Sequence, residues 1–169
     1  QNLNNHFGTI VRINSDGSQP EDNPFVKITD AKPDIWTYGH RNPQGLTLVN
    51  KTIFCHEHGP KGGDELNILT KGKNYGWPLV TYGKNYSGEL ITPLTSAPNM
   101  EDPLINWTPS IAPSSMTYYN HGYYKDLGHS LLITTLRSRS VRQIKLNSNN
   151  LPMEENILIQ GGYRYRHIG

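Results

Sequence analysis

The sequence has a single cysteine, no long apolar run and only a small excess of positive charge. Cys55 cannot form an internal disulfide, and its place in the apolar run 52–55 predicts a buried small side chain rather than a nucleophile. No apolar run approaches the roughly 18 residues that a membrane-spanning helix needs. The formal net charge is +2 and the lysines and arginines are dispersed, which argues against nucleic acid as a partner.

Helical periodicity is also nearly absent, and short strand-like segments take its place. Segments with β-branched or alternating residues are 9–14, 34–38, 47–48 continuing through 52–55, 66–69, 114–119, 130–135, 141–146 and 156–160. Turn signals separate them at 15–18, 42–45, 62–64 and 147–150. This rhythm predicts an all-β meander. Two passages have the outline of a β-propeller blade, although a sandwich or jelly roll gives a similar strand rhythm.

One long stretch, 83–113, has little strand character and contains several prolines. It is too long for an ordinary hairpin loop. We therefore expect an inserted loop that covers a functional face.

The densest group of potential ligand-binding residues lies between Tyr38 and Pro78. Gly and Pro fix unusual backbone shapes there, while Arg, Asn and carboxylates present hydrogen-bonding groups, which is typical of binding loops on a β scaffold. Arg41 offers a planar fork for an anionic or quinoid oxygen, and Asn42 adds a donor and an acceptor. From chemistry alone, a carboxylate partner for Arg41 and a turn-capping role for Asn42 explain the same residues.

A second group suits a metal ion. His56 and His58 stand at i and i+2 on one face of a strand, but no third ligand with suitable spacing is evident. The carbonyls of Gly59 and Pro60 can turn toward a hard cation, because neither residue has a side chain competing for the space. Calcium, which prefers oxygen ligands, is the natural candidate.

Three further residues extend the case for calcium. Asp64, Glu65 and Tyr75 combine carboxylates with backbone oxygens in loops whose glycines permit tight wrapping. Solvated acids at a turn would explain the two carboxylates equally well.

Two arginines near the end of the chain suit an anionic ligand. Arg164 and Arg166 stand at i and i+2, so in a strand their side chains point the same way and can grip several carboxylates through forked hydrogen bonds. Arg137 is a candidate to join them. A solvated edge strand with basic residues accounts for the same alternation and is favoured on this evidence alone.

Taken together, the motifs GHRNPQGL, EHGPKGGDELNIL, KGKNYGWP, TPSIAPSSM and RYR resemble the pyrroloquinoline-quinone (PQQ)-dependent soluble sugar dehydrogenases, the glucose/sorbosone dehydrogenase family. The resemblance covers nearly the whole chain in family order, and the wording GKNYGWPLVTYGKNY favours the aldose sugar dehydrogenase branch. It implies a six-bladed β-propeller with the quinone and calcium above the central channel. About half of such a propeller, its middle-to-late blades, would be present.

The resemblance also implies which residues form the site. Cofactor-binding positions are Arg41, Asn42, Thr81, Tyr86, Arg137, Arg164 and Arg166. The carbonyls of Gly59 and Pro60 would hold the cofactor calcium, and Glu65 with Tyr75 a second, structural calcium. Arg137 departs from the family pattern, since a lysine is usual there, and this change keeps the charge but alters reach and geometry.

The activity implied is oxidation of an aldose sugar at its anomeric carbon by hydride transfer to calcium-bound PQQ, with a separate electron acceptor downstream. Arg41 would stabilise negative charge that develops on the quinone oxygen. The family's catalytic histidine matches nothing in this chain and would lie upstream of Gln1. We therefore assign none of the seven histidines, including His40, as the base.

The chain begins at Gln1 rather than at a methionine, so we expect a fragment, a single partial propeller domain over residues 1–169 that is inactive alone. The family implies a periplasmic or secreted protein, and oligomeric state stays open. The alternative is a non-catalytic propeller that binds a protein or glycan partner. Joint presence of the cation and quinone contacts argues against that alternative.

Overall fold

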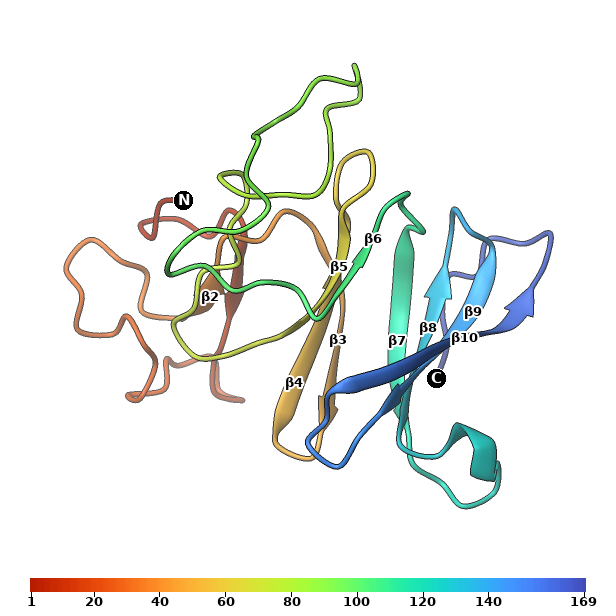
Figure 1. Ribbon diagram of the computed structural model, residues 1–169. Helices are drawn as coiled ribbons and strands as arrows, with labels where there is room; N and C mark the ends of the chain where they lie inside the picture. The colour runs from red at the N-terminus through yellow and green to blue at the C-terminus, as the bar shows by residue number, and fades with distance from the viewer.

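The computed structural model describes all 169 residues, and its regular structure is almost entirely β (Figure 1). The strands are β1 Thr9–Val11, β2 Ile35–Tyr38, β3 Pro43–Val49, β4 Thr52–Glu57, β5 Asp64–Ile68, β6 Ile105–Trp107, β7 Pro113–Tyr119, β8 Ser130–Thr135, β9 Ser140–Leu146 and β10 Pro152–Gln160, and a single 3-10 turn, η1, spans Lys125–Leu127. None of the helical structure is long and apolar enough to cross a membrane. The predicted all-β class is confirmed.

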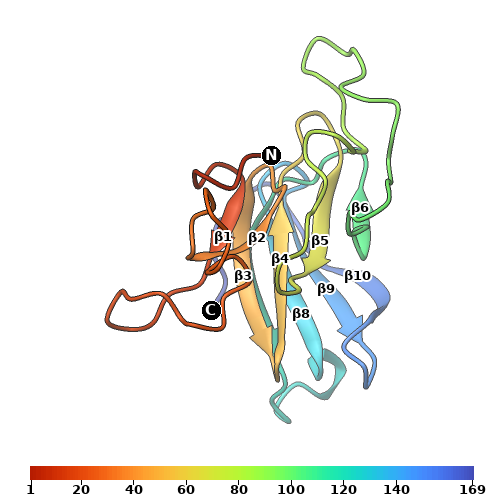
Figure 2. The same cartoon turned by 90° about the vertical axis from the view of Figure 1, so that its left-hand side faces the viewer.

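The strands form two similar four-stranded sheets and one small two-stranded sheet. In both larger sheets the strands follow chain order, β3-β4-β5-β6 and β7-β8-β9-β10, with every neighbour antiparallel. This up-and-down arrangement is that of a propeller blade. The two sheets stand side by side in Figure 1, with β3 and β7 in contact, and β1-β2 lies beyond them (Figures 1 and 2). They form an open row and do not close into a ring.

One apolar core joins the two larger sheets. Its members are Val49, Phe54, Leu66 and Trp107 from the first sheet, and Ile111, Met116, Leu131, Ile133, Ile144 and Leu146 from the second sheet and the segment leading into it. A smaller cluster contains Cys55, Leu69 and Tyr75. Cys55 is completely buried, so the prediction of a buried small side chain is confirmed, and burial raises the pKa of its thiol, which disfavours the nucleophilic thiolate.

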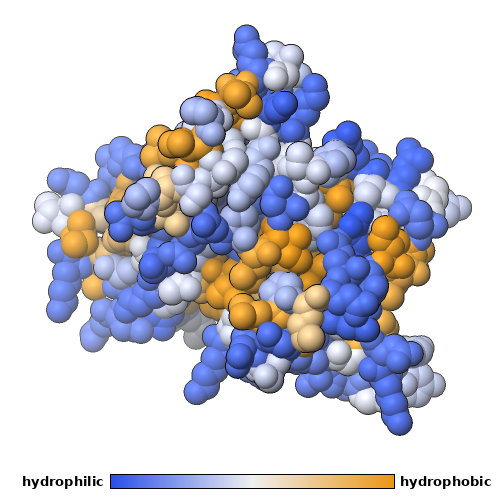
Figure 3. Space-filling model, viewed as in Figure 1, coloured by the Kyte–Doolittle hydropathy of each residue, from blue (hydrophilic) through white to orange (hydrophobic).

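Apolar side chains also reach the surface on β3 and β10, each of which is an edge strand of its own sheet. Leu46 and Leu48 of β3, and Ile157 and Ile159 of β10, are each about half exposed. On the face drawn in Figure 3, apolar residues gather near the middle among polar ones. Because β10 pairs only with β9, its other edge has unpaired backbone groups.

Two sequence expectations need correction. The stretch 83–113 is mostly irregular, but it contains β6, where Ile105 pairs with Leu66 of β5. The expected turn at 42–45 is instead the start of β3, with an irregular register between Pro43 and Gly45. Proline is tolerated there because β3 is an edge strand at that point and Pro43 is its first residue.

The loops that contain most candidate site residues meet at one end of the molecule. In the first sheet, the register of the strands brings the β2-β3, β4-β5 and β6-β7 connections to the same end. The pairs that show this are Pro43–Glu57, Glu57–Glu65 and Asp64–Trp107. In the second sheet, Pro113 pairs with Thr135 and Gln160 with Ser140, so the β8-β9 connection and the end of β10 lie at the same end. We call this end the loop face. It comprises 39–42, 58–63, 108–112, 136–139 and 161–166, together with the segment 75–86, which packs against 58–63.

Candidate functional site

The loop face is held together by the buried carboxylate of Asp64. One oxygen, Oδ1, accepts a hydrogen bond from the Gly59 amide at 3.0 Å. The other, Oδ2, accepts from the Ser110 hydroxyl at 2.7 Å and from the amides of Ile111 and Ala112 at 2.8 Å each. Asp64 has no exposed surface, so these donors compensate its burial. The carboxylate fixes the loop of the first sheet against the loop that leads into the second.

A second buried carboxylate, Glu57, positions the segment that contains Arg41. Its Oε2 accepts from the backbone amides of Arg41 at 2.7 Å and Asn42 at 3.3 Å. Its Oε1 lies 2.9 Å from Nδ1 of His40, whose Nε2 lies 2.9 Å from the Thr37 hydroxyl. His40 is buried and stacks on Tyr75 with the ring centres 4.5 Å apart. Its two nitrogens therefore both have structural partners.

The Arg41 side chain is held by carbonyls and an aromatic ring. Its Nη1 donates to the carbonyls of His58 at 3.0 Å and Gly59 at 3.1 Å, and the guanidinium lies 5.4 Å from the centre of the Trp77 ring. It forms no salt bridge, so the carboxylate partner that would give it a purely structural role is not found. Asn42 is exposed, and its Oδ1 accepts a hydrogen bond from Gln44 at 2.9 Å. The guanidinium of Arg41 is thus held by carbonyls and forms no salt bridge.

A small cavity lies directly beside Arg41. Its lining includes Arg41, Glu57, Gly59, Glu65, Tyr75 and Thr81. The volume of about 10 Å³ is close to that of one water-sized sphere. Burial, followed by the nearby charge of Glu57, raises the pKa of Glu65 to about 8. A cation placed there would favour ionised Glu65.

Tyr75 can offer this cavity its carbonyl rather than its hydroxyl. The hydroxyl donates to the carbonyl of Ile68 at 2.5 Å and accepts from the amide of Thr70 at 2.9 Å. Burial raises the pKa of the phenol to about 12, which keeps it protonated. The Tyr75 carbonyl accepts no backbone hydrogen bond. Glu65 and Tyr75 together therefore fit an oxygen-ligated ion such as calcium.

The Gly59–Gly63 turn provides a second set of oxygens. A Cβ added to Gly59 would lie 2.1 Å from the carbonyl oxygen of Gly62 and 2.4 Å from that of Gly63, so only glycine fits there. The carbonyl of Pro60 accepts no backbone hydrogen bond. Gly59 and Pro60, whose carbonyls are the expected calcium ligands, therefore belong to a tight turn with several carbonyl oxygens. Such a turn suits a hard cation, which prefers oxygen ligands.

The remaining expected residues occupy different parts of the loop face. Thr81 is buried at the small cavity, where its hydroxyl accepts from the amide of Gly83 at 3.1 Å. Arg137 lines a separate, neighbouring cavity. Tyr86 is 74% exposed. Arg164 and Arg166 are exposed after the end of β10, in a segment tied to β7 by the Ser114 hydroxyl and the Tyr165 carbonyl at 2.7 Å. The structure thus brings five expected residues together around the small cavity, namely Arg41, Gly59, Glu65, Tyr75 and Thr81. Tyr86, Arg137, Arg164 and Arg166 do not line this cavity.

The two histidines of β4 and its following loop do not form a metal site. His56 is fully buried with no hydrogen-bond partner on either ring nitrogen, and burial lowers its pKa to about 4. His58 makes a 2.7 Å hydrogen bond to the carbonyl of Pro113. No three His, Cys, Asp or Glu side chains converge as a metal-binding group. His56 and His58 are accordingly packing and loop-bridging residues.

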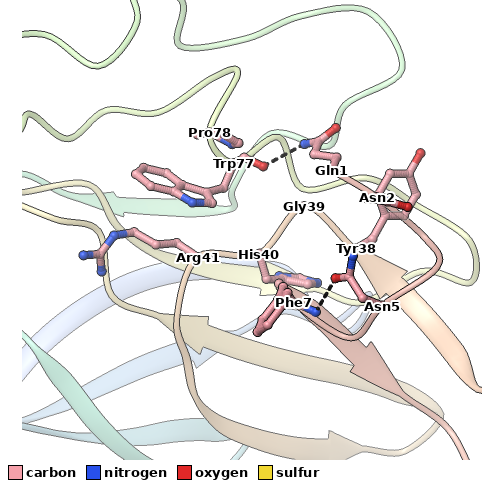
Figure 4. A pocket seen from close by; sticks show the side chains of 11 residues that line it. Gln1, Asn2, Asn5, Phe7, Tyr38, Gly39, His40, Arg41, Trp77 and Pro78 are labelled. Carbon is pink, nitrogen blue, oxygen red and sulfur yellow. Dashed lines mark hydrogen bonds between the residues drawn. The ribbon is translucent and has the colours of Figure 1, made fainter. Parts of the chain in front are cut away.

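A larger cavity that sequence reasoning missed opens on the other side of Arg41. It has a volume of about 420 Å³, and its lining includes Gln1, Phe7, Tyr38, Arg41 and Trp77 (Figure 4). Gln1 donates to the Trp77 carbonyl at 2.8 Å. No sequence signal marked the first seven residues, because their approach to Trp77 depends on the pairing of β1 with β2. Glu57 was also missed, although an acid at a strand end before a glycine-rich loop is a usable signal.

The fold and site define a class of protein, namely part of a β-propeller whose loops form a polar binding site at one end of the blades. Residues 1–169 match the family model described as glucose / sorbosone dehydrogenase. The chain belongs to this family.

Three similar proteins place it more closely. Aldose sugar dehydrogenase YliI of Escherichia coli K12 is 39% identical over 99% of this chain and 46% of its own length. A crystal structure of glucose dehydrogenase superposes with a TM-score of 0.91 at 41% identity, covering 94% of this chain and 47% of that one. The PQQ-bound aldose sugar dehydrogenase of Streptomyces coelicolor gives a TM-score of 0.70 at 28% identity, covering 94% and 41%. The chain spans about half the length of these relatives, and the predicted propeller-fragment fold is confirmed.

Proposed function

We propose that this chain is part of a quinoprotein that oxidises aldose sugars at the anomeric carbon by hydride transfer to calcium-bound PQQ. Membership of the sugar dehydrogenase family and the PQQ-bound relative support the reaction class and the cofactor. The observation that carries the proposal is the position of Arg41, a cation without a salt bridge beside two groups of oxygen atoms that could ligate a metal ion. A fixed positive charge and an oxygen-ligated calcium would each stabilise the negative charge that develops on a quinone oxygen during reduction.

We assign the residues as follows. Gly59 and Pro60 would hold the cofactor calcium through their carbonyls, and Glu65 with Tyr75 a second calcium. Arg41 and Asn42 would contact the quinone oxygens, and Thr81, Tyr86, Arg137, Arg164 and Arg166 the remainder of the cofactor. Tyr86, Arg164 and Arg166 are exposed in this structure, so their contacts require the side chains to turn toward the cofactor.

Bound PQQ would supply the hydride acceptor. The role of Arg41 is to present a fixed positive charge where negative charge develops on an oxygen during the reaction. Glu57 prepares that role by holding the amides of Arg41 and Asn42, and the His58 and Gly59 carbonyls orient the guanidinium. The charge is thus placed before the substrate arrives, which avoids reorganisation during the reaction.

We further propose that residues 1–169 form one partial domain of a longer protein. The proton acceptor would then lie outside these residues, and the sugar would bind at the loop face. By analogy with the family, the protein would be periplasmic or secreted and would pass electrons to a separate acceptor.

Replacement of Arg41 tests the proposal in the full-length protein. We expect Arg41→Ala to lower kcat on an aldose by at least about 100-fold, the scale of losing one group that stabilises developing charge. Its melting temperature should change little. Arg12→Ala is a matched control, since Arg12 also stacks on a tryptophan, Trp36, at 4.9 Å and lies outside the loop face. Wild-type turnover in Arg41→Ala at saturating PQQ and calcium would refute the assignment.

A further inference from the structure

A separate cavity on the loop face contains three positive charges and no negative one. Its volume is about 340 Å³, and its lining includes Lys61, Tyr82, Lys84, Thr108 and Arg137. None of the three cations forms a salt bridge anywhere in the structure. The volume lies within the range of small-molecule binding sites.

The two lysines are held side by side by their backbones. The amide of Lys61 donates to the carbonyl of Lys84 at 3.2 Å. A Cβ on Gly83 would lie 2.6 Å from the Gly62 carbonyl oxygen, and one on Gly63 would lie 2.5 Å from the Gly83 nitrogen. The two loops therefore touch backbone to backbone, which keeps the backbones of Lys61 and Lys84 next to each other.

The opposite wall is fixed to the same framework. The Thr108 hydroxyl accepts a hydrogen bond from the amide of Gly63 at 2.9 Å. The amide of Arg137 donates to the carbonyl of Ile111, whose own amide is held by Asp64. Lys61, Lys84 and Arg137 thus come from three different connections but share one rigid base.

Like charges gathered in a shared cavity repel one another unless an anion binds between them. A cluster that is held together by the backbone and lacks acidic partners suits a ligand with more than one negative group. The aromatic ring of Tyr82 offers such a ligand a partly exposed side wall.

We infer that Lys61 and Lys84 act with Arg137 as a cationic clamp for the carboxylates of the quinone cofactor. This inference rests on the proposed function and adds two binding residues to it. Arg137 alone keeps the charge of the usual lysine but changes its reach, and the two lysines supply further positive charge on the facing wall of the same cavity.

The test is equilibrium binding of PQQ to the full-length apo-protein in calcium, followed by absorbance or by quenching of tryptophan fluorescence. We expect Lys61→Ala/Lys84→Ala to raise Kd by about 10-fold, the combined scale of two solvent-exposed charge contacts. Its Kd should also respond less to added salt than the wild-type Kd, because screening acts on the lost contacts. Lys61→Arg/Lys84→Arg should restore most of the affinity.

The matched control is Lys51→Ala/Lys71→Ala, which removes two exposed lysines that lie outside this cavity and form no salt bridge. A Kd for the Lys61/Lys84 variant equal to that of the control would overturn the inference while leaving the proposed function intact. An unchanged PQQ affinity with a raised KM for a sugar acid, but not for a neutral aldose, would assign the clamp to an anionic substrate instead. Absence of PQQ binding by the wild-type protein would contradict the proposed function itself.

Discussion

Removing the carboxylate of Asp64 should cost the full-length protein a large part of its stability. Asp64→Ala leaves the buried amides of Gly59 and Ile111 without a hydrogen-bond acceptor. The Ser110 hydroxyl and the Ala112 amide, which are only partly buried, lose the same acceptor. A buried donor that loses its partner costs about 1–3 kcal/mol. Counting only the two fully buried amides, we expect a loss of about 2–6 kcal/mol.

Asp64→Asn should fall between the wild type and Asp64→Ala. The amide oxygen can replace Oδ2, which accepts three of the four hydrogen bonds. The NH₂ group then faces the amide of Gly59, donor against donor, and the negative charge is lost. One bond would therefore be lost and the others weakened.

The assay is chemical unfolding of the full-length protein, with the shift in midpoint compared at equal m-values. Asp126→Ala is the control, because the Asp126 side chain is exposed and makes no hydrogen bond. A shift for Asp64→Ala within about 0.5 kcal/mol of this control, the usual range for surface substitutions, would refute the role of Asp64 as the link between the loops.

Two further predictions concern β3 and β4. Gly45→Ala should lower the free energy of unfolding by about 1–3 kcal/mol, since its Cβ would lie 2.6 Å from Nε2 of buried His56. In a double-mutant cycle, adding His56→Ala should relieve that clash. Gly122→Ala is the control and should be neutral, because a Cβ there meets no atom within 4 Å. Because the folded state depresses the pKa of His56 from 6.5 to about 4, the stability that neutral His56 contributes is complete above pH 6.5 and should fall by up to about 3 kcal/mol toward pH 4. His56→Leu should flatten this part of the pH–stability profile, and an unchanged slope in urea titrations between pH 4 and 6.5 would contradict the depressed pKa.

Much of the fold could be predicted from local patterns. Segments 130–135 and 141–146 match β8 and β9 almost residue for residue, because buried β-branched and aliphatic residues dominate them. Strand β6 was missed because it has only three residues, too few to show an alternating pattern, and lies in a proline-rich stretch; its pairing with β5 defines it. Pro43 led to the wrong prediction of a turn at 42–45. Proline is common in turns, but here it is the first residue of an edge strand, where no backbone amide is needed for pairing.

The site was predictable where motifs are contiguous and not where distant segments meet. Arg41, Gly59 and Pro60 stand out because each lies in a short loop with an unusual composition. The buried hydrogen bonds of Glu57 and Asp64 depend on the register between β4 and β5 and on the approach of the second sheet, which no local pattern reports. Lys61 and Lys84 are neighbours of Arg137 only in three dimensions.

The apolar cluster that spans both four-stranded sheets limits how this protein can be rearranged by recombination. Phe54 and Leu66 on one side and Leu131 and Ile133 on the other are fully buried parts of a single cluster. A chimera that imports one sheet from a relative would bring mismatched shapes to this seam, and protein interiors tolerate such mismatch poorly. Crossover points for transplanting the loop face therefore belong before residue 39 and after residue 166, so that both sheets and their loops travel together.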